Sequence, residues 1–180
     1  SPSTLYEQVM RTGELAQRIP MGPTYLSVPI ENMVHEWTPP KRPRKAPPPT
    51  RTRATDEDIE VVAVALAAAE NPIVQTEAAG RDKACFDALV ALCDALALPV
   101  YENNQGKGSN FPKNNKMHQG FSIEPHLDTA DVALVVRSRS PWYPPSAGPH
   151  NAQVIAIDEA PLDDTMVYQS LQATSYLEGD

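Results

Sequence analysis

The centre of the chain combines short apolar runs with one long segment of helical periodicity. Residues 81–98 carry apolar side chains at intervals of three and four, which predicts an amphipathic helix. The runs at 130–136 and 152–158 are continuously apolar, as in strands that are buried on both faces of a sheet. With the shorter runs at 71–76 and 99–101, they predict an α/β fold: a Rossmann-like, three-layer parallel sheet flanked by helices.

Sheets of this kind bind ligands beyond the carboxyl ends of their strands. The loops after Thr76, Tyr101, Val136 and Ile157 are therefore the predicted location of any functional site. An aromatic and proline-rich segment at 142–145 follows one of these strands; a packed loop is its simplest interpretation, and a wall of an active site is the alternative.

The chain divides into three predicted regions. Residues 1–33 contain an expected helix at 1–19, capped by Ser3, and an expected strand at 24–28, with no evident packing partner. We interpret this region as the tail of a preceding domain. Residues 34–54 form a predicted linker rich in Pro, Lys and Arg, and residues 55–180 a central α/β domain.

Within that domain, the pattern around the sheet predicts three further features. Thr55 caps a helix that should be buried, because residues 59–69 are mostly Ala and Val. Residues 107–121 are predicted to form a polar loop with little regular structure, and residues 166–177 to contain a late edge strand.

Charge and cysteine content narrow the function classes. The chain has 15 basic and 23 acidic residues, a net charge of −8, which disfavours nucleic acid or an anionic membrane as a partner of the whole chain. The basic run at 41–53 is interrupted by prolines and lacks aromatic residues, so a solvated connector is favoured over a nucleic-acid or localisation patch. Cys85 and Cys93 lie about 12 Å apart along one helix, too far for a disulfide, which indicates reduced thiols in a cytoplasmic protein.

The remaining polar residues do not form a catalytic pattern. The four histidines have no metal-ligand spacing, so no metal site is predicted. Ser138 and Ser140 have no base nearby in the sequence, so no catalytic residue is assigned. No apolar run reaches membrane-spanning length, and no signal peptide is visible.

Three stretches, in order, resemble a known family and cover nearly the whole chain. The segment 22–29 (Gly-Pro-Thr-Tyr-Leu-Ser-Val-Pro) resembles the end of the first domain of thiamine-diphosphate-dependent enzymes of the acetolactate synthase, benzoylformate decarboxylase and oxalyl-CoA decarboxylase type. Residues 71–112, with Gln-Gly-Lys-Gly at 105–108, resemble the start of their central domain. Residues 130–158 resemble its second half.

The resemblance implies a fragment of a larger enzyme. The family has a pyrimidine-binding, a central and a diphosphate-binding domain, and its activating glutamate and metal-binding motif belong to the first and third. The fragment alone should therefore be inactive. The parent would be a lyase or transferase that uses thiamine diphosphate and Mg²⁺ on 2-oxo acids, by decarboxylation or carboligation, as a homodimer or homotetramer.

The resemblance also implies a candidate nucleotide site in the central domain, where relatives hold FAD, ADP or coenzyme A. Asp158 matches the acid that contacts ribose, and Arg139 an arginine near the phosphates. The small-residue turn and the loop at the domain interface are matched by further residues: Ala78, Ala79 and Gly80 in the turn, and Gly106, Lys107 and Gly108 in the loop.

Two departures from the family pattern put this nucleotide site in doubt. Glu77 places an acid close to any phosphate, and Arg137 replaces a usual glycine, where it can fill the nucleotide's space or pair with Glu77. The alternatives are a purely architectural domain, a free-standing Rossmann-like nucleotide-binding module, and a non-enzymatic interaction domain that uses the basic arm.

Overall fold

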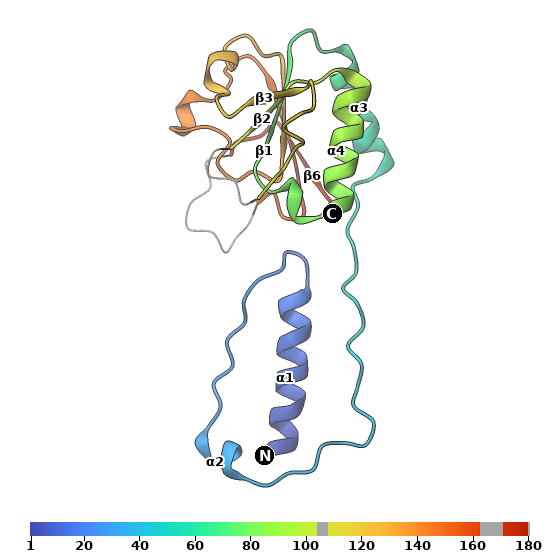
Figure 1. Ribbon diagram of the computed structural model, residues 1–180, viewed down its shortest axis with the longest axis vertical. Coiled ribbons are helices and arrows are strands. Elements are labelled where there is room, and N and C mark those ends of the chain that lie inside the picture. Colours follow the sequence, from blue (N-terminus) through green and yellow to red (C-terminus); the bar gives the residue numbers. More distant parts are fainter. Residues whose placement is uncertain (104–107, 163–170, 180) are drawn as a thin grey trace. The chain divides into compact units, whose positions relative to one another are not determined.

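The sheet of the second unit is the main element of the structure. The computed structural model describes residues 1–103, 108–162 and 171–179, and the chain forms two compact units, Ser1–Arg51 and Thr52–Asp180. Within the described residues of the second unit, six strands form one sheet in the order β3-β2-β1-β4-β5-β6, and every neighbouring pair is parallel (Figure 1). The strands are β1 (Pro72–Thr76), β2 (Val100–Glu102), β3 (His118–Gly120), β4 (Val132–Val136), β5 (Gln153–Asp158) and β6 (Ser175–Glu178). The predicted α/β class and parallel sheet are confirmed.

The two α-helices described in this unit begin at capping side chains, of which Thr55 was predicted. α3 (Asp56–Ala68) begins after Thr55, whose side chain accepts a hydrogen bond from the Asp58 N–H at 3.2 Å. α4 (Lys83–Leu96) begins after Asp82, whose carboxylate accepts from the N–H groups of Ala84 and Cys85. α4 ends at Ala97, which is left-handed with φ 54°, a common way for a helix to finish.

Side chains of the strands alternate between two cores. Val74, Leu134 and Ile155 face a cluster that includes Leu66 of α3 and Leu89 of α4. The other face holds a second cluster around Ile73, Ala133 and Val154. The segments that cover this second cluster are largely non-helical, with Ile123 and Leu127 flanking the short turn η2 (Glu124–His126) and Trp142 following β4. The central strands are therefore buried on both sides, as their continuous apolar runs predict.

Three expectations about the second unit have definite outcomes. The late edge strand is confirmed as β6, and residues 166–170 of the segment predicted to contain it lie outside the described residues. β3 lies in the predicted loop at 107–121 and was missed, because three residues give too short a pattern to recognise. The prediction of a buried α3 is wrong: Val61 and Val64 are 56% and 57% exposed.

The first unit contains α1 (Pro2–Gln17) and the short α2 (Ile30–Val34), and neither buries a residue completely. Arg44 folds back to pair with Glu14 and, at 3.7 Å, with Glu7, both on α1. Two further expectations for the first unit are wrong. Ser1 rather than Ser3 caps α1. The expected strand at 24–28 is not formed, because the described part of this unit offers no neighbouring strand to pair with it.

No helix among the described residues has both the length and the apolar character needed to cross a membrane.

Asp131, directly before β4, provides a testable effect of pH on stability. Its carboxylate accepts hydrogen bonds from the backbone N–H groups of Glu70 and Asn71, at 2.6 and 3.0 Å. Desolvation acts to raise the pKa of Asp131, but these backbone bonds outweigh it and lower the pKa below the usual 3.8. Because the folded-state pKa is lowered, the stabilisation is fully present above the ordinary Asp pKa and is lost as the pH falls through the folded-state value.

We therefore expect Asp131→Asn to weaken the dependence of stability on pH below about 4. Urea unfolding of both proteins at pH 7 and at about pH 3 measures this effect. The exposed Asp87, which pairs with Lys83 at 2.6 Å, gives a matched control as Asp87→Asn. Equal acid sensitivity of the wild type and Asp131→Asn would contradict the assignment.

Candidate functional site

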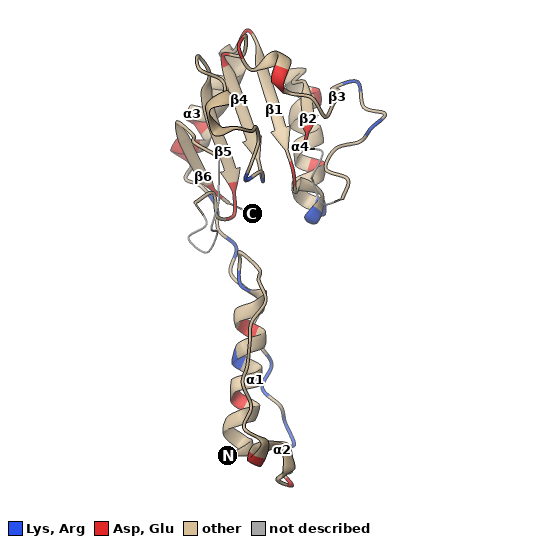
Figure 2. Cartoon of the chain, turned by 90° about the vertical axis from the view of Figure 1, so that its left-hand side faces the viewer, with Lys and Arg blue, Asp and Glu red and all other residues tan. Residues whose placement is uncertain are grey.

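The strand order places the candidate site between the ends of β1 and β4. Chain connections lead from β1 to one side of the sheet, through β2 and β3, and from β4 to the other, through β5 and β6. Adjacent loops therefore diverge beyond the carboxyl ends of β1 and β4, which is the usual ligand position in doubly wound folds. Figure 2 shows that charged residues gather at this edge, with acidic residues ending β1 and β5 and basic residues following β4.

Glu77, directly after β1, connects the end of β1 to the residues that follow β4. Its Oε2 atom accepts a hydrogen bond from Ser138 Oγ at 3.1 Å and another from the backbone N–H of Arg139 at 3.2 Å. A backbone N–H and a hydroxyl beyond a parallel strand are donors that a phosphate would use. The carboxylate occupies both donors, and its charge repels an anion at the same place.

Arg137 does not pair with Glu77, which corrects one of the expected arrangements. Its side chain is buried, 8% exposed, and its guanidinium Nη2 lies 3.3 Å from Glu159 Oε2, beyond the end of β5. Its backbone has φ 48°, in the left-handed region. Glycine adopts this conformation most easily, which explains why glycine suits the position that Arg137 fills.

Gly80 lies in the turn η1 (Ala79–Arg81) and is held by a different part of the chain. Its N–H donates to Asn110 Oδ1 at 3.1 Å. A Cβ atom on Gly80 would lie 1.9 Å from the carbonyl oxygen of Ser109. Ala79 is fully buried in the core below α4, while Ala78 is partly exposed. The small residues of this turn therefore allow close packing of residues 109–110 in the space where a ligand's phosphates were expected.

Asp158 and Arg139 reach the same sheet edge as the turn after β1. Asp158 Oδ1 accepts from the Ala160 N–H at 3.2 Å, so the carboxylate stabilises its own turn. Arg139 is exposed, and its N–H belongs to the Glu77 contact. Of the predicted interface loop, Gly106 and Lys107 lie outside the described residues, and Gly108 has φ 98°.

A buried ionic cluster at the end of β2 was missed by the sequence analysis. The side chain of Glu102 is 2% exposed and contacts Lys113 Nζ and, at 3.0 Å, His118 Nε2. The other carboxylate oxygen accepts the backbone N–H of Asn110 at 3.1 Å. The signal that could have found it is an acid that ends a buried strand, followed by a Lys and a His in a polar loop. Because Glu102 pairs with the charge of Lys113 and also contacts His118 and the Asn110 N–H, the cluster is suited to fixing residues 110–118.

The thiols of α4 are poorly suited to reaction. Burial raises the pKa of Cys93 to about 12. Burial also raises the pKa of the half-buried Cys85, although the nearby charge of Arg137 acts to lower it. Both cysteines are free. Within residues 1–103, 108–162 and 171–179, no three His, Cys, Asp or Glu residues gather in a group that could hold a metal ion.

The fold is that of a doubly wound α/β domain, and the candidate site lies at its switch point. No family model matches the sequence, and no curated protein matches it. Among solved structures, the chain is similar to a protein from Mycobacterium smegmatis described as a thiamin diphosphate-dependent enzyme, with a TM-score of 0.78 and 21% identity, over 97% of this chain and 34% of that one. It is also similar to benzoylformate decarboxylase from Polynucleobacter necessarius, with a TM-score of 0.77 and 20% identity, over 99% of this chain and 34% of that one.

These similarities establish the fold. The chain spans about a third of the length of both solved structures. The likeness to thiamine-diphosphate enzymes that the sequence indicated is thereby confirmed at the level of the fold.

Proposed function

We propose that this chain is the central domain, with the tail of a pyrimidine-binding domain, of a thiamine-diphosphate-dependent enzyme that acts on 2-oxo acids. The fold match over nearly the whole chain, at a TM-score of 0.78, supports this assignment. The parent would be a decarboxylase or carboligase, hence a lyase or transferase, in the cytoplasm. It would hold thiamine diphosphate and Mg²⁺ through its pyrimidine- and diphosphate-binding domains, as a homodimer or homotetramer. Bound there, the cofactor would supply the carbanion that attacks a carbonyl group.

The role that we propose for the domain itself is architectural. The observation that carries this proposal is that the Glu77 carboxylate accepts hydrogen bonds from both Ser138 Oγ and the Arg139 N–H at the switch point. The Gly80 N–H is likewise taken by Asn110. With its donors bonded inside the chain, the domain is suited to holding the two cofactor-binding domains in register rather than to binding an adenine nucleotide of its own.

The second candidate is an adenine-nucleotide site for FAD, ADP or coenzyme A. It is favoured by the convergence of the 78–80 turn, Arg139 and Asp158 on one sheet edge. Against it stands the charge of Glu77. At an effective dielectric constant of 20, a negative charge about 5 Å away opposes an anion by about 3 kcal/mol, or roughly a hundredfold in affinity before screening by salt.

Isothermal titration of ADP, FAD and coenzyme A into the chain separates the two candidates. We expect the wild type to bind none of the three with a Kd below about 1 mM. In Glu77→Ala the affinity for ADP should rise by about 10- to 100-fold over the wild type, because the repulsion between the carboxylate and the phosphates is removed. Glu60→Ala, at an exposed site on α3, is the control for a change of net charge alone. Micromolar binding by the wild type that Asp158→Ala abolishes would replace the architectural role with the nucleotide site.

The assignment to a thiamine-diphosphate enzyme has its own test. The parent polypeptide should release CO₂ from, or condense, 2-oxo acids only when thiamine diphosphate and Mg²⁺ are present. The 180-residue chain should show no activity under the same conditions. A parent that neither binds thiamine diphosphate nor turns over any 2-oxo acid with it would contradict the proposal.

A further inference from the structure

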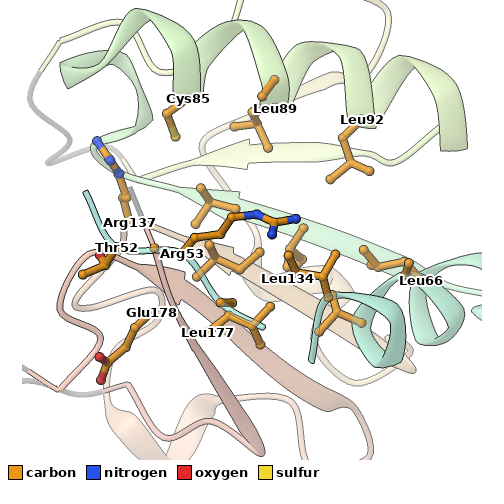
Figure 3. A pocket seen from close by; sticks show the side chains of 18 residues that line it. Thr52, Arg53, Leu66, Cys85, Leu89, Leu92, Leu134, Arg137, Leu177 and Glu178 are labelled. Carbon is orange, nitrogen blue, oxygen red and sulfur yellow. The ribbon is translucent and has the colours of Figure 1, made fainter. Parts of the chain in front are cut away.

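An open apolar groove lies between α3 and α4, above the sheet (Figure 3). Its volume is about 370 Å³. α3 contributes Val62 and Leu66, α4 contributes Leu89 and Leu92, and the sheet below contributes Leu134 and Leu177. A groove of this size with apolar walls is large enough to take side chains or a ligand.

Both arginines that line the groove are already paired, which argues against a small anionic ligand. Arg53, whose side chain crosses the groove in Figure 3, pairs with Asp56 at 2.7 Å, and Arg137 pairs with Glu159 at 3.3 Å. Thr52 also has an interaction partner. Among the described residues, no buried polar side-chain atom without a partner lines the groove. Small-molecule sites orient their ligands through a few such polar groups, so an apolar polypeptide surface is the better match.

Both helices expose apolar side chains along the groove. Ile59 of α3 lines it and is 38% exposed, and Ala88 on α4 is exposed along its edge. Covering this apolar surface with another segment would gain about 25 cal/mol per Å² covered. A helix laid between two helices would do this with residues at spacings of three and four.

We propose that the groove is the docking site for an apolar helix from the polypeptide that follows Asp180 in the parent enzyme. The inference rests on the proposed function, and the solved structures of the same fold are about three times as long as this chain, which covers 34% of each. Glu178 and Gly179, at the end of β6, themselves line the groove. The continuing polypeptide is therefore delivered to the groove without a long connection.

Thiol labelling of the parent and of the 180-residue chain tests the proposal. In a Cys85→Ala background, Ala88→Cys places a reporter at the edge of the groove. Ala91→Cys places a matched one on an exposed part of the same helix that does not line it. Cys93 is fully buried and its pKa is raised to about 12, so it should not react. We expect both reporters to label at similar rates in the isolated chain, and Ala88→Cys alone to be protected, at least tenfold, in the parent.

Each other outcome points to a definite alternative. Equal labelling of both reporters in a parent that turns over 2-oxo acids with thiamine diphosphate would overturn the docking proposal alone. Protection of Ala88→Cys in a parent without thiamine diphosphate binding would support docking and overturn the proposed function. Protection that already develops in the isolated chain as its concentration rises, with dimers in gel filtration, would assign the groove to a second copy and overturn the proposal.

Discussion

Replacing Gly80 with alanine should destabilise the α/β unit by about 3 kcal/mol, in the upper part of the range for overpacking. The new Cβ would lie 1.9 Å from the carbonyl oxygen of Ser109, and that neighbour is backbone rather than the flexible end of a side chain. Either the turn after β1 or the 109–110 segment must move. Such a movement also strains the bond from the Gly80 N–H to Asn110 Oδ1. Thermal unfolding should show a midpoint lowered by roughly 10 °C for a domain of this size.

Gly179→Ala is the matched control, because it is the same substitution at a site with room for a methyl group. The nearest atoms to a Cβ there are 3.8 Å away, which is ordinary van der Waals contact. Its midpoint should stay within about 2 °C of the wild type. If Gly80→Ala unfolds at the same temperature as Gly179→Ala, the close approach of residues 109–110 to the turn is not a feature of the folded protein.

Truncating Glu102 to alanine should have the second largest effect, a loss of about 2–4 kcal/mol in the free energy of unfolding. The side chain is 2% exposed and serves Lys113, His118 and the backbone N–H of Asn110 together. Its removal leaves the buried Asn110 N–H and the largely buried His118 ring without this acceptor, whereas water can solvate the half-exposed Lys113. Urea denaturation at pH 7 measures the loss.

Hydrogen exchange of the same variant distinguishes a cluster that fixes a loop from one that only adds stability. Hydrogen exchange of the backbone N–H groups at 110–118 should rise in Glu102→Ala, while exchange within β4 follows only the change in global stability. Glu60→Ala, an exposed acid of α3, should change neither. Unchanged protection at 110–118 would show that contacts other than Glu102 hold this segment.

The sheet was predictable because its strands obey local rules. The continuous apolar runs of β4 and β5 are long enough to indicate strands buried on both faces, and Thr55 gives a local start signal for α3. β3 escaped prediction because its three residues, His-Gln-Gly, are stabilised by pairing with β2 and not by their own composition. The expected strand at 24–28 failed for the converse reason, since a strand sequence forms a strand only where a partner is present.

The sequence by itself determined which residues reach the carboxyl edge of the sheet. It placed the 78–80 turn, Arg139 and Asp158 there, because parallel strands carry their following loops to the same edge. Only the tertiary structure decided what these groups contact. Three contacts join residues that lie 22 to 62 positions apart in the sequence. Glu77 accepts a hydrogen bond from Arg139 after β4, Arg137 pairs with Glu159, and Asn110 accepts the Gly80 N–H. Hydrogen bonds are short and directional, and an ion pair needs its two groups within about 4 Å, so the pairing of such distant groups follows from the packed backbone and not from local pattern.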